Sequence, residues 1–346
     1  MNRIPVLLLT GFLGSGKTTV LNRLLADPAF RDTLAIINES GAVGIDHLLV
    51  EKGTEDILLL EGGCMCCRMR SSLSETIRSC LRQTEAGARA SFRRIVIETS
   101  GLADPIPILQ DMIADIGFGR RCTLSGIVTS VDAATASNTL DRHPEAVAQV
   151  AVADVILVSK TDLVTSAERA ELDRRLSALN CEATRFEACF GAVDPACVWP
   201  ERLGLSEAWL ARAQHASRTG GPGAGVVTAA LAFEGMLDGG AVESWLEETV
   251  ATLGPHLLRL KGVLNIVGSR LPVVVHGVQH LVHAPSTLPR WPAGHRHSRL
   301  VLIGRDIDQD ILDDAIRRLA ARARSVGPPE AAMLDSALPT AADHCG

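Results

Sequence analysis

The feature that most constrains this chain is a glycine-rich loop, GFLGSGKTT, at residues 11–19. The apolar run Val6–Leu9 precedes the loop, and an apolar stretch with helical character, residues 20–25, follows it. A strand, a glycine-rich turn and a helix form the setting in which backbone N–H groups and a helix N-terminus bind phosphate oxygens. The sequence therefore predicts a P-loop that binds a nucleoside triphosphate, rather than an ordinary turn between a strand and a helix.

The residue types within this loop predict separate roles. Lys17 is expected to reach the β- and γ-phosphates, and the Thr18 hydroxyl is expected to ligate Mg²⁺. The other residues predicted to contact the phosphates are Gly11, Gly14, Ser15, Gly16 and Thr19. We therefore expect nucleotide and Mg²⁺ at the carboxyl end of the first strand.

Length and composition indicate an ordinary globular protein. The chain has 346 residues, 47% of them hydrophobic and 21% charged, which is enough for two domains. The net charge of −6 argues against broad nucleic-acid binding, which needs a basic surface. No apolar run approaches the roughly 18 residues of a transmembrane helix, and the first strand begins too early to leave room for a signal peptide. We expect a cytoplasmic protein that binds neither nucleic acid nor membrane.

Apolar segments alternate with helical stretches through the first half of the chain. This alternation predicts an α/β fold of the P-loop type, with a parallel sheet covered by helices on both faces. The expected strands are Val6–Leu9, Leu34–Ile37, Ile57–Leu60, Ile95–Ile97, Ile127–Val131 and Val155–Val158. The expected helices include Ser72–Leu81 and Ser166–Ala178, the latter after a capping box of Thr165 and Glu168. Together they predict a nucleotide-binding domain over residues 1–181.

The second half of the chain predicts a smaller domain. Residues 182–225 have weak periodicity and end in the run TGGPGAG, which is typical of a linker. An α+β domain is expected at residues 226–325, followed by a disordered tail at 326–346. Its expected strands are Val226–Phe233, Leu258–Val267, Leu271–Val278 and Arg299–Gly304, with helices at Ala241–Leu253 and from Asp308 to about Arg324.

The strand Ile95–Ile97 is followed by Glu98 and Gly101, whose residue types are those that contact Mg²⁺ and the terminal phosphate in P-loop proteins. A carboxylate at the end of a strand beside a P-loop holds Mg²⁺ or its water, and Glu98 fits that role. A glycine three residues later can donate its N–H to the γ-phosphate and respond when that phosphate is lost. Gly101 fits this second role, so we expect Lys17, Glu98 and Gly101 to carry the catalysis.

The strand Val155–Val158 leads into residues that point to guanine. The carboxylate of Asp162 can accept both N–H donors on guanine's Watson–Crick edge, and adenine offers no equivalent pair. The predicted base-binding residues are Ser159, Lys160 and Asp162. Asn is the usual first residue of such a motif, and we expect the Ser159 departure to touch nucleotide specificity only. The alternative is a P-loop kinase or ATPase with structural cysteines, which would prefer ATP.

Three of the nine cysteines, Cys64, Cys66 and Cys67, fall within four residues. Three such thiols can ligate one soft or borderline metal, for which Zn²⁺ is the first choice. The three thiols do not resemble the paired C-x₂-C motifs of a closed structural zinc site, and without a fourth ligand nearby they favour an open site that can release its metal. Glu39, after the second strand, would add a carboxylate. A reversible redox or metal-sensing role for Cys66 and Cys67 is the alternative. The remaining cysteines are interpreted as structural or incidental.

These motifs, in this order, resemble the CobW-type GTPases, which are metallochaperones in the class of the urease and hydrogenase nickel-insertion GTPases. The resemblance rests on the P-loop, on NESGAVGID at 38–46, GGCMCC at 62–67, ETSGLADP at 98–105 and SKTD at 159–162. In the second domain it rests on RLKG at 259–262, GVQ at 277–279, Trp291 and SRLVLIG at 298–304. It covers about residues 4–324.

The resemblance implies GTP hydrolysis coupled to delivery of zinc, or in some branches another metal such as cobalt or iron, to a client metalloprotein. It leaves open a nucleotide-dependent homodimer, which is common among related GTPases. Ser40 and Ala42 depart from the aromatic and acidic residues that the family often has there, which removes one candidate ligand. Late histidines occur at His276, His280, His283, His295 and His297. His276 and His280 are expected to share a strand face, and none of the five is predicted as a primary ligand.

Overall fold

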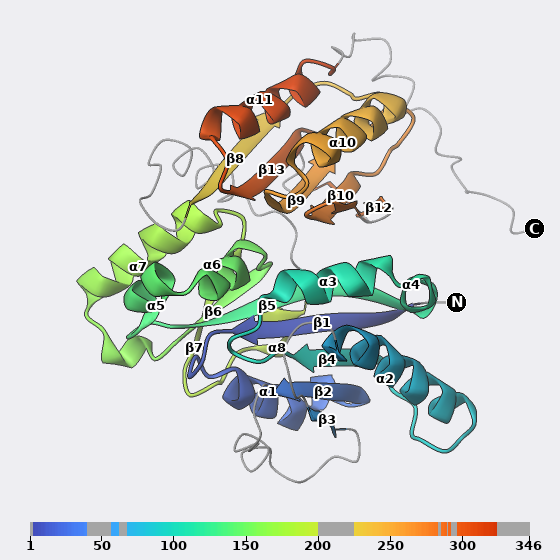
Figure 1. Cartoon of the computed structure of the whole chain (residues 1–346), viewed down its shortest axis with the longest axis vertical. Helices are drawn as coiled ribbons and strands as arrows, with labels where there is room; N and C mark the ends of the chain where they lie inside the picture. Colours follow the sequence, from blue (N-terminus) through green and yellow to red (C-terminus); the bar gives the residue numbers. More distant parts are fainter. Residues whose placement is uncertain are drawn as a thin grey trace, which may run out of the picture.

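A computed structural model of the chain describes residues 3–39, 57–61, 68–199, 225–282, 285–288, 290–291 and 296–323. These residues form two sheets with helices between them (Figure 1). The first sheet belongs to the amino-terminal part of the chain and the second to the carboxyl-terminal part. None of the helices in these ranges is long and apolar enough to cross a membrane.

The first sheet is parallel throughout, with the strand order β3-β2-β4-β1-β5-β6-β7. Its strands are β1 (Ile4–Gly11), β2 (Thr33–Glu39), β3 (Ile57–Glu61), β4 (Arg94–Glu98), β5 (Cys122–Asp132), β6 (Val155–Ser159) and β7 (Thr184–Ala188). On β1, Val6 and Leu8 are buried on one face and Leu7 and Leu9 on the other, as a central parallel strand requires. The predicted fold class and all six predicted strands are confirmed.

Helices cover both faces of this sheet. One face carries α1 (Lys17–Ala26), the short 3₁₀ turn η1 (Pro28–Phe30) and α8 (Pro195–Val198). The other carries α2 (Arg68–Glu85), α3 (Pro105–Ala114), α4 (Ile116–Arg121), α5 (Ala136–Arg142), α6 (Pro144–Ala151) and α7 (Ser166–Leu179). The capping box of α7 is confirmed, since the Glu168 carboxylate accepts from the Thr165 N–H at 2.8 Å and the Glu168 N–H donates to the Thr165 hydroxyl.

The parallel sheet continues past residue 181, where the sequence suggested that a linker begins. β7 pairs with β6 in parallel, and α8 follows it. Trp199 then packs edge-on against Phe30, and the Arg94 guanidinium lies over both rings. β7 is an edge strand of sequence TRFEA with one fully buried residue, Ala188, so it lacks the apolar run that identified the other strands.

The second sheet is antiparallel, with the order β11-β10-β9-β13-β8 and β12 paired with β10. Its elements are β8 (Val226–Phe233), α10 (Gly239–Leu253), β9 (Leu257–Leu264), β10 (Val273–Val278), β11 (Leu281–Val282), β12 (Ser286–Thr287), β13 (Ser298–Arg305) and α11 (Gln309–Ala320). Helices α10 and α11 cover its outer face, where the fully buried Trp245 donates its indole N–H to the Ala315 carbonyl at 2.8 Å. The predicted α+β domain is confirmed in its strands and helices.

The histidines on this sheet are arranged differently from our expectation. β10 ends at Val278, and Gln279, with φ of +51°, turns the chain into β11. His280 therefore lies in the turn, and it does not share a strand face with His276. His283 and His295 lie outside the described residues.

The inner face of the antiparallel sheet packs on α3, α6 and α7, and the apolar core continues across this contact. Four charged side chains meet there: Arg259 and Lys261 on β9, and Asp154 and Glu182 from the loops before β6 and β7. Arg259 and Glu182 are buried, and Lys261 and Asp154 are partly buried. Lys261 Nζ lies 3.0 Å from Asp154 Oδ1 and 3.1 Å from Glu182 Oε1, and Arg259 pairs with both carboxylates. We call these four residues the interdomain ion cluster. Two positive and two negative charges balance within it.

Candidate nucleotide site

The glycine-rich loop leaves β1 and wraps the start of α1. Gly14 and Gly16 have φ of +73° and +91°, and Gly16 is the N-cap of α1. This left-handed conformation is open to glycine and strained for other residues. Lys17 is 8% exposed, and its Nζ donates to the main-chain carbonyl of Phe12 at 3.1 Å. The loop thus has the local conformation of a phosphate-binding P-loop, with its lysine folded against it.

Thr18 and Glu98 meet at the carboxyl edge of the sheet. Glu98 ends β4, pairs in register with Leu9 of β1 and is 4% exposed. Thr18 Oγ1 donates to Glu98 Oε1 at 2.7 Å. A hydroxyl and a carboxylate are hard oxygen ligands of the kind that Mg²⁺ prefers. The two residues predicted for Mg²⁺ are therefore neighbours, and their chemistry fits that ion.

The loop after β4 is pressed against the P-loop. The Thr99 N–H donates to the Leu9 carbonyl at 3.0 Å, and its hydroxyl donates to Thr10 Oγ1 at 2.7 Å. A Cβ on Gly101 would lie 2.7 Å from the Leu13 nitrogen and 2.9 Å from its Cα. Gly101 therefore lies directly beside the P-loop, an approach that only glycine allows. Its predicted role requires this position.

Ser159 supports the P-loop directly. Its hydroxyl donates to the Ser15 carbonyl at 2.8 Å and lies 3.3 Å from the Val131 carbonyl, and Ser130 on β5 donates to the same Ser15 carbonyl at 2.6 Å. We expected this departure from Asn to affect nucleotide specificity only. The contacts correct that interpretation, because Ser159 also fixes the backbone of the phosphate-binding loop.

Lys160 follows β6 as the N-cap of the 3₁₀ turn η3 (Thr161–Leu163), and Asp162 lies within that turn. Lys160 has φ of +55°, and its Nζ lies 2.5 Å from Asp132 Oδ2 at the end of β5. Asp132 is 6% exposed, whereas Asp162 is exposed. Asp132 was not singled out by the sequence analysis, although its position at a strand end was a signal. The pair orients Lys160 along the same sheet edge.

The loop after β7 belongs to this edge as well, and the sequence analysis missed it. Ser159 of β6 pairs in register with Ala188 of β7, so Cys189 follows beside Lys160. A Cβ on Gly191 would lie 2.8 Å from the carbonyl carbon of Thr19. Phe190 is 76% exposed with φ of +47°. In the sequence, Gly191 shortly after β7 was the one signal that could have placed this loop at the edge.

The predicted transition-metal ligands are mostly outside the described residues. Cys64, Cys66 and Cys67 lie in the undescribed segment 62–67, which joins the end of β3 to the start of α2. Glu39 ends β2 and pairs in register with Glu61, but its side chain is not described. Within the described parts of the chain, no three His, Cys, Asp or Glu side chains gather as a metal site would require.

The cysteines that the structure describes differ in how far they are buried. Cys80, Cys122 and Cys181 are buried, Cys197 is half-buried, and Cys189 is exposed. Burial raises the pKa of the Cys80 thiol, and it raises the pKa of Cys122 to about 11. These two thiols are therefore protonated at neutral pH, as residues that fill a core should be.

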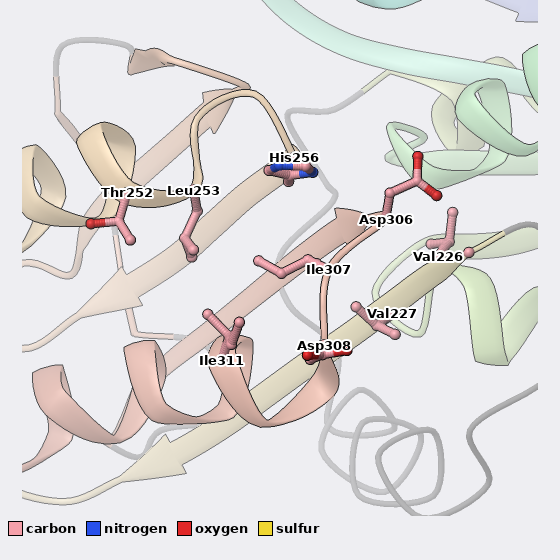
Figure 2. Close-up of a pocket in the computed structure, with 10 residues that line it drawn as sticks. Val226, Val227, Thr252, Leu253, His256, Asp306, Ile307, Asp308 and Ile311 are labelled. Carbon is pink, nitrogen blue, oxygen red and sulfur yellow. The ribbon is translucent and has the colours of Figure 1, made fainter.

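A hollow of about 760 Å³ lies in the carboxyl-terminal domain, apart from the P-loop (Figure 2). Its floor is apolar, with Val227, Leu253 and Ile307 on different elements, and its charged side chains are Asp306 and Asp308. His256 lies at one end, with Nδ1 3.2 Å from the Arg305 carbonyl. None of the predicted nucleotide-binding residues lines this hollow, so it is separate from the candidate nucleotide site.

The fold and the site together define a P-loop nucleotide-binding protein with an appended α+β domain. Residues 5–187 match the CobW/HypB/UreG nucleotide-binding domain, and residues 226–320 match the C-terminal domain of the cobalamin synthesis protein CobW. The chain belongs to the CobW/HypB/UreG family. The family that the motifs resemble is thereby confirmed.

Two relatives and one solved structure match nearly the whole chain. The zinc chaperone YjiA of Escherichia coli is 31% identical over 311 residues, covering 90% of this chain and 96% of YjiA. The zinc chaperone CobW of Pseudomonas aeruginosa is 28% identical over 357 residues, covering 92% of each. The crystal structure of Zn(II)-bound YjiA GTPase from Escherichia coli superposes with a TM-score of 0.67 and 25% identity, covering 92% of this chain and 99% of that one.

Proposed function

We propose that this protein is a cytoplasmic GTPase that couples its nucleotide state to the binding of zinc and to zinc transfer to a client metalloprotein. The observation that carries the proposal is that Thr18, Glu98 and Gly101 lie together at the P-loop. Thr18 and Glu98 have the residue types that bind Mg²⁺, and Gly101 has the main-chain N–H that can contact the terminal phosphate. Membership of the CobW/HypB/UreG family, and relatives named zinc chaperones and GTPases, support the same activity.

In hydrolysis, a water oxygen bonds to the γ-phosphorus while the bond from that phosphorus to the β–γ bridging oxygen breaks. Backbone N–H groups of the P-loop and the Lys17 ammonium neutralise the charge on the phosphate oxygens. Thr18 and Glu98 would hold Mg²⁺, which neutralises further charge on the β- and γ-phosphates. Gly101 is assigned the N–H that contacts the γ-phosphate, and Asp162 the carboxylate that accepts from guanine.

The metal is assigned to Cys64, Cys66 and Cys67, with Glu39 as a further ligand. The described strands support coupling of this site to the nucleotide, because segment 62–67 starts at the carboxyl end of β3 and Glu98 ends β4. In the order β3-β2-β4 these ends are two strand spacings apart, about 10 Å. Nucleotide and metal can then each favour one conformation, and by linkage their effects on each other's affinity are equal.

The test is the zinc affinity of the purified, reduced protein in three states: nucleotide-free, with GDP, and with a non-hydrolysable GTP analogue. A stoichiometric site is expected whose affinity shifts by roughly tenfold between states, a coupling of about 1.4 kcal/mol. A Cys66→Ser/Cys67→Ser variant should lose the site while keeping guanine-nucleotide affinity. Equal zinc affinity in all three states would remove the coupling. Preference for ATP over GTP would instead favour a kinase or ATPase.

A thiol switch at Cys66 and Cys67 is the second candidate, because two adjacent thiols can be oxidised reversibly. Mass spectrometry of the protein after mild oxidant distinguishes it from a metal carrier. An unchanged count of free thiols in the zinc-loaded protein supports the carrier. A reversible loss of two thiols at these positions, with no response of zinc affinity to nucleotide, supports the sensor.

A further inference from the structure

Helix α6 carries a buried glutamine that touches the loop proposed to sense the γ-phosphate. Gln149 is 1% exposed, and its Nε2 donates to the carbonyls of Gly101 at 3.2 Å and Ala103 at 3.0 Å. Gly101 is 48 positions away in the chain. No motif marks Gln149, because α6 otherwise has the composition of an ordinary packed helix.

The contacts of this amide are one-sided. Its Nε2 has two carbonyl partners, whereas its Oε1 is buried and accepts no hydrogen bond within the described part of the chain. A buried acceptor left in this way lowers stability, by about 1–3 kcal/mol in typical proteins. An apolar side chain of similar size would fill the same space without that penalty. The side chain is therefore better explained by what its N–H groups hold than by packing alone.

Those N–H groups complete the support of the loop after β4. Main-chain and hydroxyl bonds of Thr99 to β1 fix the beginning of this loop, and Gln149 fixes two carbonyls further along it. Between these supports, Gly101 lies against Leu13 of the P-loop. The Gly101 N–H is thus held relative to the phosphate-binding loop from two directions.

The carboxyl-terminal domain holds α6 near both of its ends. Arg305, the last residue of β13, donates through Nη2 to the carbonyl of Pro144, the first residue of α6, at 3.1 Å. Arg259 of β9 donates to the carbonyl of Val152, the residue that follows α6. A shift of the carboxyl-terminal domain would therefore move the helix that carries Gln149.

We propose that Gln149 is a positioning residue for GTP hydrolysis, which holds Gly101 in place for the γ-phosphate, and that the carboxyl-terminal domain adjusts this position through α6. The inference rests on the proposed function, since it concerns the same γ-phosphate. Gln149 itself does not touch nucleotide. With Gln149 and the carboxyl-terminal domain, the site includes a residue and a domain that lie outside the phosphate-binding motifs.

The test is a Gln149→Met variant of the full chain, which keeps the length and volume of the side chain and removes its N–H donors. Single-turnover GTP hydrolysis, affinity for GDP, affinity for a non-hydrolysable GTP analogue and the melting temperature are measured. The hydrolysis rate should fall by roughly 10- to 100-fold. The ratio of GTP-analogue affinity to GDP affinity should fall about fivefold, because only the analogue has a γ-phosphate, while GDP affinity stays within about twofold of wild type.

The matched control is Thr228→Val, which removes a buried side-chain bond to the Leu179 carbonyl, 3.3 Å away, at the interface with α7. It should melt earlier without changing the rate or the affinity ratio. If Gln149→Met behaves like this control, Gln149 has a structural role only and the inference is overturned. If Gln149→Met does not fold, Gln149→Leu is measured in the same way, since its side chain also lacks a donor.

A second variant, Arg305→Met, tests the role of the carboxyl-terminal domain from its own side. It removes the contact to Pro144 and leaves every proposed nucleotide contact in place, so the hydrolysis rate should change by about two- to fivefold. A rate equal to that of wild type would overturn the role of this domain. If wild type neither hydrolyses GTP nor distinguishes the analogue from GDP, the proposed function fails. If wild type hydrolyses GTP and distinguishes the analogue from GDP, and Gln149→Met has the same rate and affinities as wild type, only the inference about Gln149 is overturned.

Discussion

The two sheets of this molecule place their polar and charged side chains in different ways. In the parallel sheet, polar side chains such as Glu98, Asp132 and Ser159 stand where strands end, facing the edge at which the P-loop lies. In the antiparallel sheet, Arg259 and Lys261 lie in the middle of β9 and point into the interface with the other domain. Charge at the first location is available to a ligand, whereas charge at the second is neutralised within the protein.

This difference separates the parts of the molecule that perform chemistry from those that fix its shape. A polar group at a strand end can exchange its partner for a ligand without disturbing the sheet, because the bonds of the sheet lie behind it. A charge within an interface cannot lose its partner without a large penalty. Substitutions at the two places are therefore expected to change different measured quantities.

The largest expected effect is that of Lys17→Met. The substitution removes the ammonium that we propose neutralises the phosphate oxygens, and the hydrolysis rate should fall by roughly 100- to 1000-fold. The melting temperature of the nucleotide-free protein should change little, since the bond from Lys17 Nζ to the Phe12 carbonyl lies within the P-loop and not between the packed elements of the core. Single-turnover hydrolysis and calorimetry check both statements. A large loss of stability would mean that the P-loop lysine also holds the fold.

Asp154→Asn should have the opposite effect, with a large loss of stability and no loss of nucleotide affinity. It leaves the buried Arg259 and the partly buried Lys261 beside Glu182 with one carboxylate missing, and removal of one partner of a buried ion pair typically costs about 3–5 kcal/mol. Denaturant unfolding should show this loss of unfolding free energy. GDP affinity at a temperature where the variant is folded should remain that of wild type. A loss of affinity in step with the loss of stability would contradict the separation of the two regions.

The interdomain ion cluster also predicts the direction of the pH dependence. The Arg259 and Lys261 charges outweigh the effect of burial and hold the pKa of Asp154 well below its usual value. The stabilisation from ionised Asp154 is therefore complete above the ordinary carboxyl pKa of about 4 and is lost as the pH falls below it. The difference in unfolding free energy between wild type and Asp154→Asn should shrink below about pH 4. A difference that stays constant in acid would show that folding does not lower the pKa of Asp154.

The sequence predicted which residues gather at the P-loop better than it predicted the contacts that surround them. Glu98, Gly101 and Lys17 follow fixed spacings from apolar strands, so the topology of a parallel sheet brings them together. Gln149 lies in a packed helix, and its partners are main-chain carbonyls, so no spacing of residue types marks it. β7 was missed for a related reason, since an edge strand needs few apolar residues. The turn at Gln279 separated His276 from His280 through a left-handed backbone that the strand pattern did not indicate.

Ser159→Ala tests a residue between the two kinds of location. Its hydroxyl is buried and bonds the Ser15 carbonyl, but it lies at the nucleotide edge. Loss of one such bond costs about 1 kcal/mol, so GDP affinity should fall about fivefold. Ser130 still donates to the same carbonyl, which limits the effect. Isothermal titration with GDP and with ADP measures both the affinity and the base preference. A changed preference with unchanged GDP affinity would restore a role in specificity alone.

The smallest effect concerns the reactivity of Cys189. This thiol is exposed in the loop after β7, directly after Ala188, which pairs with Ser159, whereas Cys122 is buried with its pKa raised to about 11. Because only the thiolate reacts with an alkylating reagent, Cys122 should stay unmodified at pH 7.5. Cys189 should react, and bound GDP should slow that reaction by about two- to fivefold as the nucleotide covers this edge of the sheet. Time-resolved mass spectrometry of each cysteine peptide measures both rates. Equal rates for Cys189 with and without GDP would mean that the loop after β7 lies outside the nucleotide site, and the ligand-facing edge would then end at β6.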